Sequence, residues 1–215
     1  MDKVFKELGK YKVIPVIVLE NAEDADNLSD VLCDRGLPVA EVTFRTEAAE
    51  ETIRRMRERH PDMLVGAGTV LSKDQVDRAV GAGAKFIVTP GLNPDVVRYC
   101  QEKAVPVCPG IATPSEVEKA MSLGLDLVKF FPAVPLGGVK MLKALEAVYT
   151  NMCFMPTGGI NGQNISDYLA LERVTACGGS WMVKKDLIRS GRFDEIKTRI
   201  EEITEMSWFD SLYGG

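Results

Sequence analysis

Short apolar segments recur along the chain at a nearly regular interval, and this recurrence limits the folds that the chain can adopt. Their first residues lie about 20 to 27 residues apart, which leaves room for one helix after each strand. Continuous apolar strands are typical of a parallel sheet that helices cover on both faces. The eight segments that we predict to be strands are Val13–Leu19, Val39–Thr43, Met63–Ala67, Lys85–Thr89, Val105–Pro109, Leu125–Phe130, Met152–Pro156 and Arg173–Cys177.

The segments between these strands carry helix signals. Ser72 is a suitable N-cap for a helix over Lys73–Val80, because its hydroxyl can accept a hydrogen bond from the first turn. Thr113 precedes a proline at the first helical position, and Glu116 follows in the acidic first turn. The chain therefore alternates between strands and helices.

Eight strand–helix units are the composition of a (β/α)8 TIM barrel, an α/β fold, and 215 residues is close to the compact limit of that barrel. No linker or change in composition divides the chain, so we predict a single barrel domain over residues 1–215. An open doubly wound sheet is the alternative that the same alternation allows.

Composition and charge limit the partners, the cell compartment and the state of the thiols that we expect. The net charge of −5 without a basic block argues against nucleic-acid binding. No apolar run has the length of a membrane span, and the N-terminus lacks a signal-peptide core, so we expect a cytoplasmic protein. The five cysteines never form a Cys-x-x-Cys pair, and we expect reduced, mostly buried thiols.

The sequence contains a single histidine, His60, in a polar stretch before a proline. One histidine without clustered thiols does not predict a protein-built metal site, and it does not support a histidine-based triad. We therefore expect no metal and no cofactor, and catalysis would have to use carboxylates, lysine, arginine or hydroxyl groups.

Polar and glycine residues gather where the predicted strands end. In barrels of this class the active site lies at the carboxyl ends of the strands, so these residues are expected to meet at one mouth. Glycine-rich loops after the seventh and eighth strands are a common place for phosphate, although a pair of glycines alone usually marks a turn. The residues in question are Glu41, Arg45, Gly66, Gly68, Thr69, Thr89, Pro90, Lys129, Thr157, Gly158, Gly159, Gly178, Gly179 and Ser180.

Lys129 lies inside the apolar run Leu125–Ala133. A buried ammonium without a partner is unfavourable and usually loses its proton, and a neutral lysine amine forms a Schiff base with a carbonyl substrate. The alternative is that the ammonium reaches the rim while its stem packs. Glu41 likewise has two interpretations, as an acid/base group or as a structural carboxylate paired with Arg45.

These motifs, taken in order, resemble those of the 2-keto-3-deoxy-6-phosphogluconate (KDPG) aldolases, which often also act on 4-hydroxy-2-oxoglutarate (KHG). The likeness extends from about Val13 to Lys184. It departs at Val18–Asn21, where some relatives carry basic residues. The motifs that carry the resemblance are Glu41–Thr46, Val65–Val70, Thr89–Gly91, Pro109–Ile111, Val128–Ala133, Pro156–Ile160 and Gly178–Trp181.

The resemblance implies a metal-independent class I aldolase on a (β/α)8 barrel, usually a homotrimer, with a small keto-acid phosphate as substrate. It implies that Lys129 forms the Schiff base and that Glu41 is the acid/base carboxylate. It further implies that Arg45 and Thr69 bind the keto-acid carboxylate. Pro90 and Phe131 would line the pocket, and the phosphate contacts would come from Gly158, Gly159, Gly179 and Ser180.

Other functions stay open from the residues alone. The nearest is an aldolase for a related 2-keto acid, such as 2-keto-3-deoxy-6-phosphogalactonate. A phosphate-binding isomerase or synthase, or a non-catalytic barrel that binds a phosphorylated ligand, would not need an imine. The aromatic tail, with Trp208, Phe209 and Tyr213, is expected to pack on the chain itself or on a neighbouring subunit.

Overall fold

The computed structural model describes residues 1–206. The predicted packing of Trp208, Phe209 and Tyr213 therefore lies outside the described residues. Within residues 1–206 the chain alternates between strands and helices, and every strand pair is parallel. The predicted α/β fold with a parallel sheet is confirmed.

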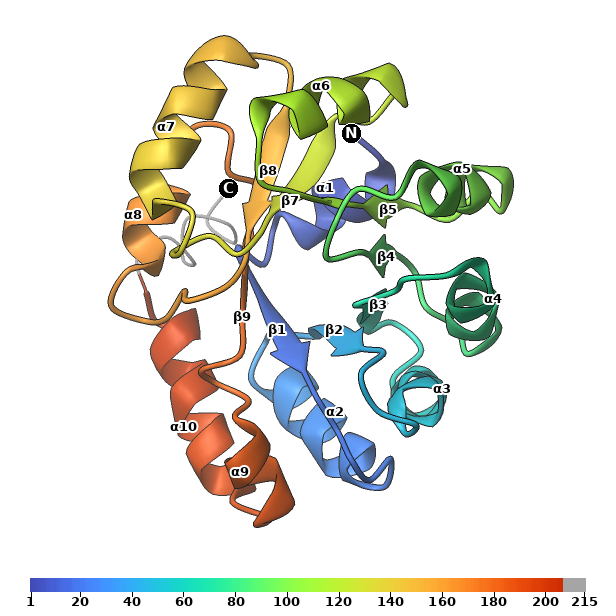
Figure 1. Ribbon diagram of the computed structural model, residues 1–215. Coiled ribbons are helices and arrows are strands. Elements are labelled where there is room, and N and C mark those ends of the chain that lie inside the picture. The colour runs from blue at the N-terminus through green and yellow to red at the C-terminus, as the bar shows by residue number, and fades with distance from the viewer. Residues whose placement is uncertain (207–215) are drawn as a thin grey trace.

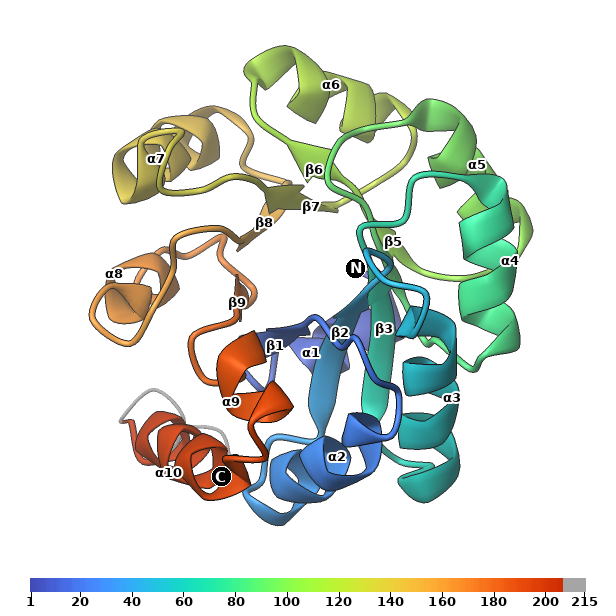
Figure 2. The ribbon, with the colours of Figure 1, turned by 60° about the horizontal axis from the view of Figure 1, so that its bottom comes forward.

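The strands form two sheets that curve around a common interior (Figures 1 and 2). The six-stranded sheet has the order β5-β4-β3-β2-β1-β9, and the three-stranded sheet has the order β6-β7-β8. The strands are β1 (Val13–Ile17), β2 (Val39–Thr43), β3 (Leu64–Gly68), β4 (Ile87–Val88), β5 (Val107–Cys108), β6 (Gly110–Ile111), β7 (Leu127–Phe130), β8 (Cys153–Pro156) and β9 (Cys177–Gly179).

Helices surround the strands in both views, and α1 lies closer to the strands than the others do (Figures 1 and 2). Phe5 of α1 is buried, and its ring meets that of Phe86 edge to face, with 6.2 Å between the ring centroids. The helices are α1 (Lys3–Leu8), α2 (Asp24–Asp34), α3 (Ala49–Arg59), α4 (Lys73–Gly81), α5 (Pro94–Glu102), α6 (Pro114–Ser122), α7 (Gly138–Val148), α8 (Ile165–Leu169), α9 (Lys185–Arg189) and α10 (Phe193–Thr204).

Most of the predicted strands differ from those observed by one or two residues at an end, and two of them differ further. Pro109 has no N–H to donate, so the run Val105–Pro109 ends as β5 and the chain resumes pairing in β6. The last strand is not Arg173–Cys177 but Cys177–Gly179, whose residues pair with Val13–Pro15 of β1. Gly178 and Gly179 are therefore part of the strand rather than of the loop after it.

The predicted helix starts are confirmed at two positions. The Ser72 hydroxyl accepts a hydrogen bond from the Gln75 amide, at 3.2 Å, and α4 begins directly after Ser72. Thr113 and Glu116 form a reciprocal capping box at the start of α6. Each cap satisfies backbone donors that have no partner within the helix, and this defines where the helix begins.

The cysteines match the expectation from their spacing. All five are free thiols, and Cys100, Cys108 and Cys177 are buried. Burial raises the pKa of the Cys100 thiol to about 11, so this thiol stays neutral at physiological pH. No helix within residues 1–206 is long and apolar enough to cross a bilayer.

Gly66 of β3 provides a test of the packing between the sheet and its interior. A β-carbon at this position would overlap the ring of Phe86, which is fully buried. We expect Gly66→Ala to lower the free energy of unfolding by about 1–3 kcal/mol, the usual effect of overpacking. The matched control is Gly81→Ala, because a β-carbon at the end of α4 meets nothing within 4 Å.

The two alanine variants are compared by urea unfolding followed by circular dichroism. Gly81→Ala should be neutral or slightly stabilising, because alanine favours the helix. Equal stabilities for the two variants would contradict the close contact between Gly66 and Phe86.

Candidate active site

Lys129 and Glu41 form a buried ion pair at the centre of the candidate site. The Lys129 Nζ atom lies 3.2 Å from Glu41 Oε1, although 88 residues separate the two in sequence. Lys129 is 4% exposed and Glu41 is fully buried, so the ammonium does not reach the rim. The structure pairs Glu41 with Lys129, whereas the Arg45 Nε atom donates a hydrogen bond to the Thr43 hydroxyl at 3.3 Å.

Neighbouring strands hold this pair in place. Lys129 of β7 is in register with Gly110 of β6, and Glu41 of β2 is in register with Gly66 of β3. Gly68, also on β3, leaves the space that the Glu41 carboxylate occupies, because a β-carbon at Gly68 would overlap Glu41 Oε1. The strands thus bring an amine and a carboxylate to one buried point.

The surroundings of the pair suit a reaction rather than a purely structural role. The Lys129 Nζ atom lies 5.2 Å from the centre of the Phe131 ring, a distance at which the ring face attracts a cation. Glu41 Oε2 is buried and has no hydrogen-bond partner among the described residues. An unpaired buried carboxylate oxygen is unfavourable, and it is an acceptor available to a substrate hydroxyl.

Six of the residues that the resemblance implies line a cavity of about 150 Å³. Gly158 and Gly159 adopt positive φ angles of 102° and 82°, which glycine accepts without strain. The backbone there can approach a ligand closely, and loop amides of this kind bind anions. The predicted residues that line the cavity are Arg45, Phe131, Gly158, Gly159, Gly179 and Ser180.

The other four predicted residues, Lys129, Glu41, Thr69 and Pro90, do not line this cavity. Thr69 follows Gly68 directly and has a φ angle of 56°, which is rare for a β-branched residue. Such strain is concentrated at functional sites. The carbonyl of Pro90 lies against Gly110, the register partner of Lys129. Thr69 thus follows the glycine that makes room for Glu41, and Pro90 contacts the strand that pairs with the Lys129 strand.

Four further residues line the cavity, and the resemblance does not imply a role for any of them. Thr157 belongs to the Thr-Gly-Gly motif after β8, and that motif was a signal for it. The Gly-Gly-Ser motif was likewise a signal for Gly178. Val16 and Ile160 are ordinary apolar residues, and nothing in the sequence distinguishes them from the core.

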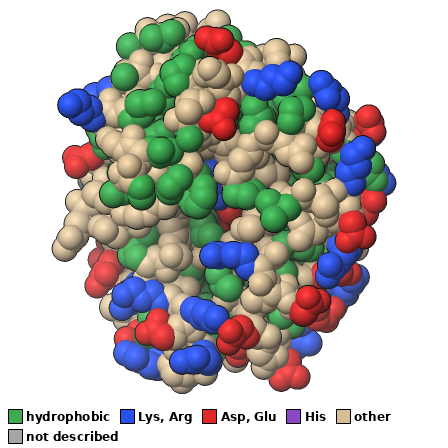
Figure 3. Space-filling model, in the orientation of Figure 1, with side chains coloured by type: hydrophobic (Ala, Val, Ile, Leu, Met, Phe, Trp, Pro, Cys, Tyr) green, Lys and Arg blue, Asp and Glu red, His purple; other side chains and the backbone are tan. Residues whose placement is uncertain are grey.

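Acidic and basic side chains lie in a hollow near the middle of the face seen in Figure 3. A larger cavity, of about 430 Å³, is lined by residues such as Phe5, Val105 and Leu127, and none of the predicted site residues lines it. Among residues 1–206 no group of three or more His, Cys, Asp or Glu side chains could hold a metal ion.

Gly68→Ala tests the position of the Glu41 carboxylate. The added methyl group would displace Glu41 Oε1 from Lys129. A misplacement of about 1 Å in a reacting group lowers turnover by roughly 10²-fold, and we expect a loss of this size in the cleavage of 2-keto acids. Steady-state kinetics measure it, with Gly81→Ala as the control. Wild-type turnover in Gly68→Ala would show that the carboxylate position is unimportant.

Comparisons with known proteins agree on one family. The family model described as KDPG and KHG aldolase matches residues 4–199. The 2-dehydro-3-deoxy-phosphogluconate aldolase of Haemophilus influenzae is 48% identical over 205 residues, which cover 95% of this chain and 97% of that protein. The KHG/KDPG aldolase of Escherichia coli K12 is 42% identical, over 90% of this chain and 91% of that protein.

The similarity extends to three dimensions. A crystal structure of KDPG aldolase from Legionella pneumophila superposes with a TM-score of 0.89 and 38% sequence identity, covering 93% of this chain and 96% of that chain. In that structure pyruvate is captured as a covalent carbinolamine intermediate. A carbinolamine is the adduct of an amine with a carbonyl group, and it precedes a Schiff base.

Proposed function

The chain belongs to the KDPG and KHG aldolase family, and from this membership we propose that it cleaves 2-keto-3-deoxy-6-phosphogluconate to pyruvate and glyceraldehyde 3-phosphate through a Schiff base on Lys129. The observation that carries the proposal is the buried contact of 3.2 Å between Lys129 Nζ and Glu41 Oε1. It supplies an amine nucleophile with a base within reach.

The first half of the reaction forms the imine. Glu41 takes a proton from the Lys129 ammonium, and the neutral amine adds to the C2 ketone to give a carbinolamine. Glu41 returns this proton to the carbinolamine hydroxyl, which leaves as water; the product is a protonated imine, whose positive nitrogen can accept an electron pair, and Glu41 is a carboxylate again. Burial of Lys129 keeps the bulk solvent away from this nitrogen.

The second half breaks the carbon–carbon bond. Glu41 takes the proton of the C4 hydroxyl, directly or through a water molecule. The electron pair of the C3–C4 bond moves to the imine nitrogen, and glyceraldehyde 3-phosphate leaves. The resulting enamine is protonated at C3, with Glu41 or its water molecule as the donor. Hydrolysis of the imine then frees pyruvate and restores Lys129.

The remaining implied residues bind the two ends of the substrate in this proposal. Arg45 suits the keto-acid carboxylate because its planar guanidinium can bind both oxygens, and Thr69 adds a hydroxyl. Pro90 and Phe131 line the apolar side of the pocket. The phosphate lies against Gly158, Gly159, Gly179 and Ser180 at the ends of β8 and β9.

The architecture that we infer for the enzyme is a single closed (β/α)8 barrel. Isolated parallel bridges link Phe154 with Val174 and Thr157 with Gly178, between β8 and the β9 segment. On the other side only Pro109 separates β5 from β6. Both links support closure of the two sheets. We further infer a homotrimer in solution, and light scattering after gel filtration should give the mass of three chains rather than one.

The test of the proposed function is a comparison of substrates. Pyruvate release from KDPG is followed with lactate dehydrogenase, next to the C4 epimer 2-keto-3-deoxy-6-phosphogalactonate and to KHG, since the matching family model includes KHG aldolases. We expect KDPG to have the highest kcat/KM, and a chelator should leave it unchanged. Preference for the C4 epimer, or no cleavage of any of the three, would contradict the proposal.

A further inference from the structure

The cavity beside the glycine loops adjoins a second, outer cavity of about 370 Å³. Val16, Arg45 and Ser180 line both of them. Of these two cavities, Lys184 and Lys185 line the outer one and not the inner one. We propose that Lys184 binds the phosphate group of the substrate and sets the preference of the enzyme for phosphorylated 2-keto acids. The inference rests on the proposed function.

The path of the chain places Lys184 close to the phosphate loop. The Val183 amide donates a hydrogen bond to the Ser180 carbonyl, at 3.2 Å, and this turn brings the following residue back toward Ser180. Lys184 is exposed, so its long side chain can extend across the opening of the cavity. Lysine and arginine side chains also gather over α9 in the space-filling view (Figure 3).

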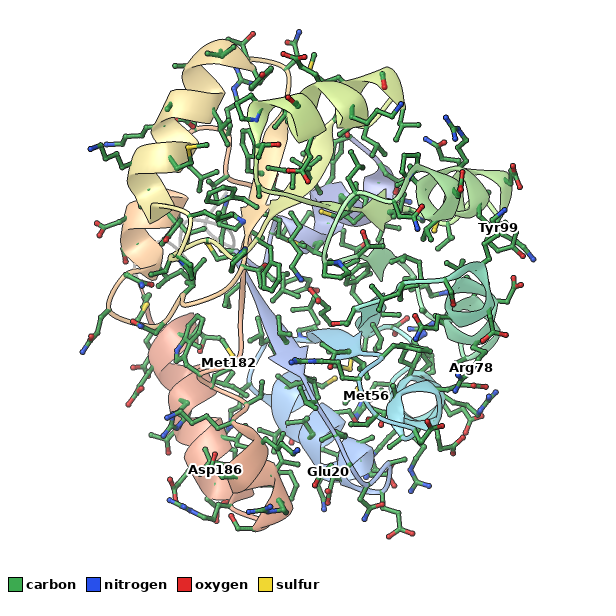
Figure 4. All side chains as sticks on the ribbon, in the orientation of Figure 1. Glu20, Met56, Arg78, Tyr99, Met182 and Asp186 are labelled. Carbon is green, nitrogen blue, oxygen red and sulfur yellow. The ribbon has the colours of Figure 1, made fainter. Side chains whose placement is uncertain are left out.

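Of the two lysines that line the outer cavity, Lys184 is the one that remains available to bind a phosphate. The ammonium of Lys185 lies 2.6 Å from Glu20 Oε1, and this hydrogen bond holds the pKa of the Glu20 carboxyl below its usual range. No salt bridge involves Lys184 within residues 1–206. Figure 4 shows Glu20 after β1 and Asp186 on the neighbouring α9. Asp186 also lines the outer cavity and would repel an anion, whereas Lys184 in the same wall would attract it.

The charge of the substrate explains why a cation is needed here. A phosphate monoester carries about −1.5 to −2 charges at pH 7. Arg45 is the only charged residue that lines the inner cavity within residues 1–206, and in the proposed reaction it binds the carboxylate at the other end. Backbone amides alone would leave the phosphate without a counter-charge. Lysine is a suitable phosphate ligand because it acts as a point charge on a flexible stem.

The test compares Lys184→Gln with Lys185→Gln. Lys185→Gln is the matched control, because it removes the same charge from a neighbouring lysine whose ammonium is hydrogen-bonded to Glu20. We expect Lys184→Gln to raise the KM for KDPG about 5- to 20-fold with kcat unchanged, the range for one charge-assisted contact at a partly exposed site. Lys184→Arg should restore most of the affinity, and Lys185→Gln should change KM less than about twofold.

A second measurement uses ligands that separate the two ends of the substrate. Inorganic phosphate, as a competitive inhibitor, should bind Lys184→Gln more weakly by a similar factor. The pyruvate concentration that half-saturates trapping by borohydride should stay unchanged, because pyruvate has no phosphate.

Three outcomes overturn the inference. An unchanged KM for KDPG in Lys184→Gln, with a wild type that cleaves KDPG, removes Lys184 from the site and leaves the proposed function intact. An equal loss of affinity for phosphate and for pyruvate would make Lys184 a structural residue. Failure of the wild type itself to cleave KDPG would defeat the proposed function and this inference together.

Discussion

Replacing Lys129 by methionine should abolish aldol cleavage. Methionine keeps the length and the apolar stem of the side chain but has no amine, so neither the carbinolamine nor the imine can form. Removal of a residue that forms the covalent intermediate lowers kcat by more than about 10⁴-fold in comparable enzymes, and we expect a loss of that size. Pyruvate release from KDPG, followed with lactate dehydrogenase, measures it.

The stability of this variant must be controlled, because Lys129→Met leaves Glu41 as an unpaired charge in a buried position. Breaking a buried ion pair from one side typically costs about 3–5 kcal/mol. The double variant Lys129→Met/Glu41→Gln removes both charges, so it should unfold at a higher urea concentration than the single variant and still be inactive. Lys140→Met, at an exposed position of α7, should keep wild-type activity. Activity of Lys129→Met within tenfold of the wild type would contradict the role of Lys129.

Glu41→Gln should separate the two halves of the reaction. Glutamine keeps the shape of the side chain, and its carbonyl can still accept the hydrogen bond from Lys129 Nζ, but it cannot take a proton. General acid–base catalysis contributes about 10²- to 10⁴-fold, and we expect kcat for cleavage to fall within that range. Imine formation with pyruvate should persist at least in part.

Rapid-quench kinetics and borohydride trapping measure these two steps of the Glu41→Gln variant side by side. Glu51→Gln, at an exposed position of α3, is the matched control and should behave like the wild type. Undiminished cleavage by Glu41→Gln would remove Glu41 from its proposed role. Complete loss of trapping together with cleavage would instead show that imine formation itself requires Glu41.

Local signals in the sequence were sufficient for most elements of the fold. Apolar runs predicted the strands because parallel strands buried on both faces are continuously apolar, and the caps at Ser72 and Thr113 depend on neighbouring residues only. The last strand was misplaced by four residues at its start. Glycines carry no side-chain pattern, and the register of β9 is set by its pairing with β1, more than 160 residues away in sequence.

The candidate site shows the same division between local and long-range information. Residue types at the strand ends indicated Lys129, Glu41 and the glycine loops, because chemistry in such folds gathers at those ends. The contact between Lys129 and Glu41 could not be predicted because 88 residues separate them in sequence, and the pairing of Glu41 with Arg45 therefore stayed open. Val16 lines the cavity, but no local signal in the sequence distinguishes it from an ordinary core residue.

The most direct test of the account is the trapping of the Schiff base with pyruvate. The protein is incubated with pyruvate and borohydride, digested, and mapped by peptide mass spectrometry. The account predicts a reduced pyruvyl adduct on the peptide that contains Lys129 and on no other lysine, together with irreversible loss of activity. No adduct, or an adduct on a different residue such as Lys140, would contradict it.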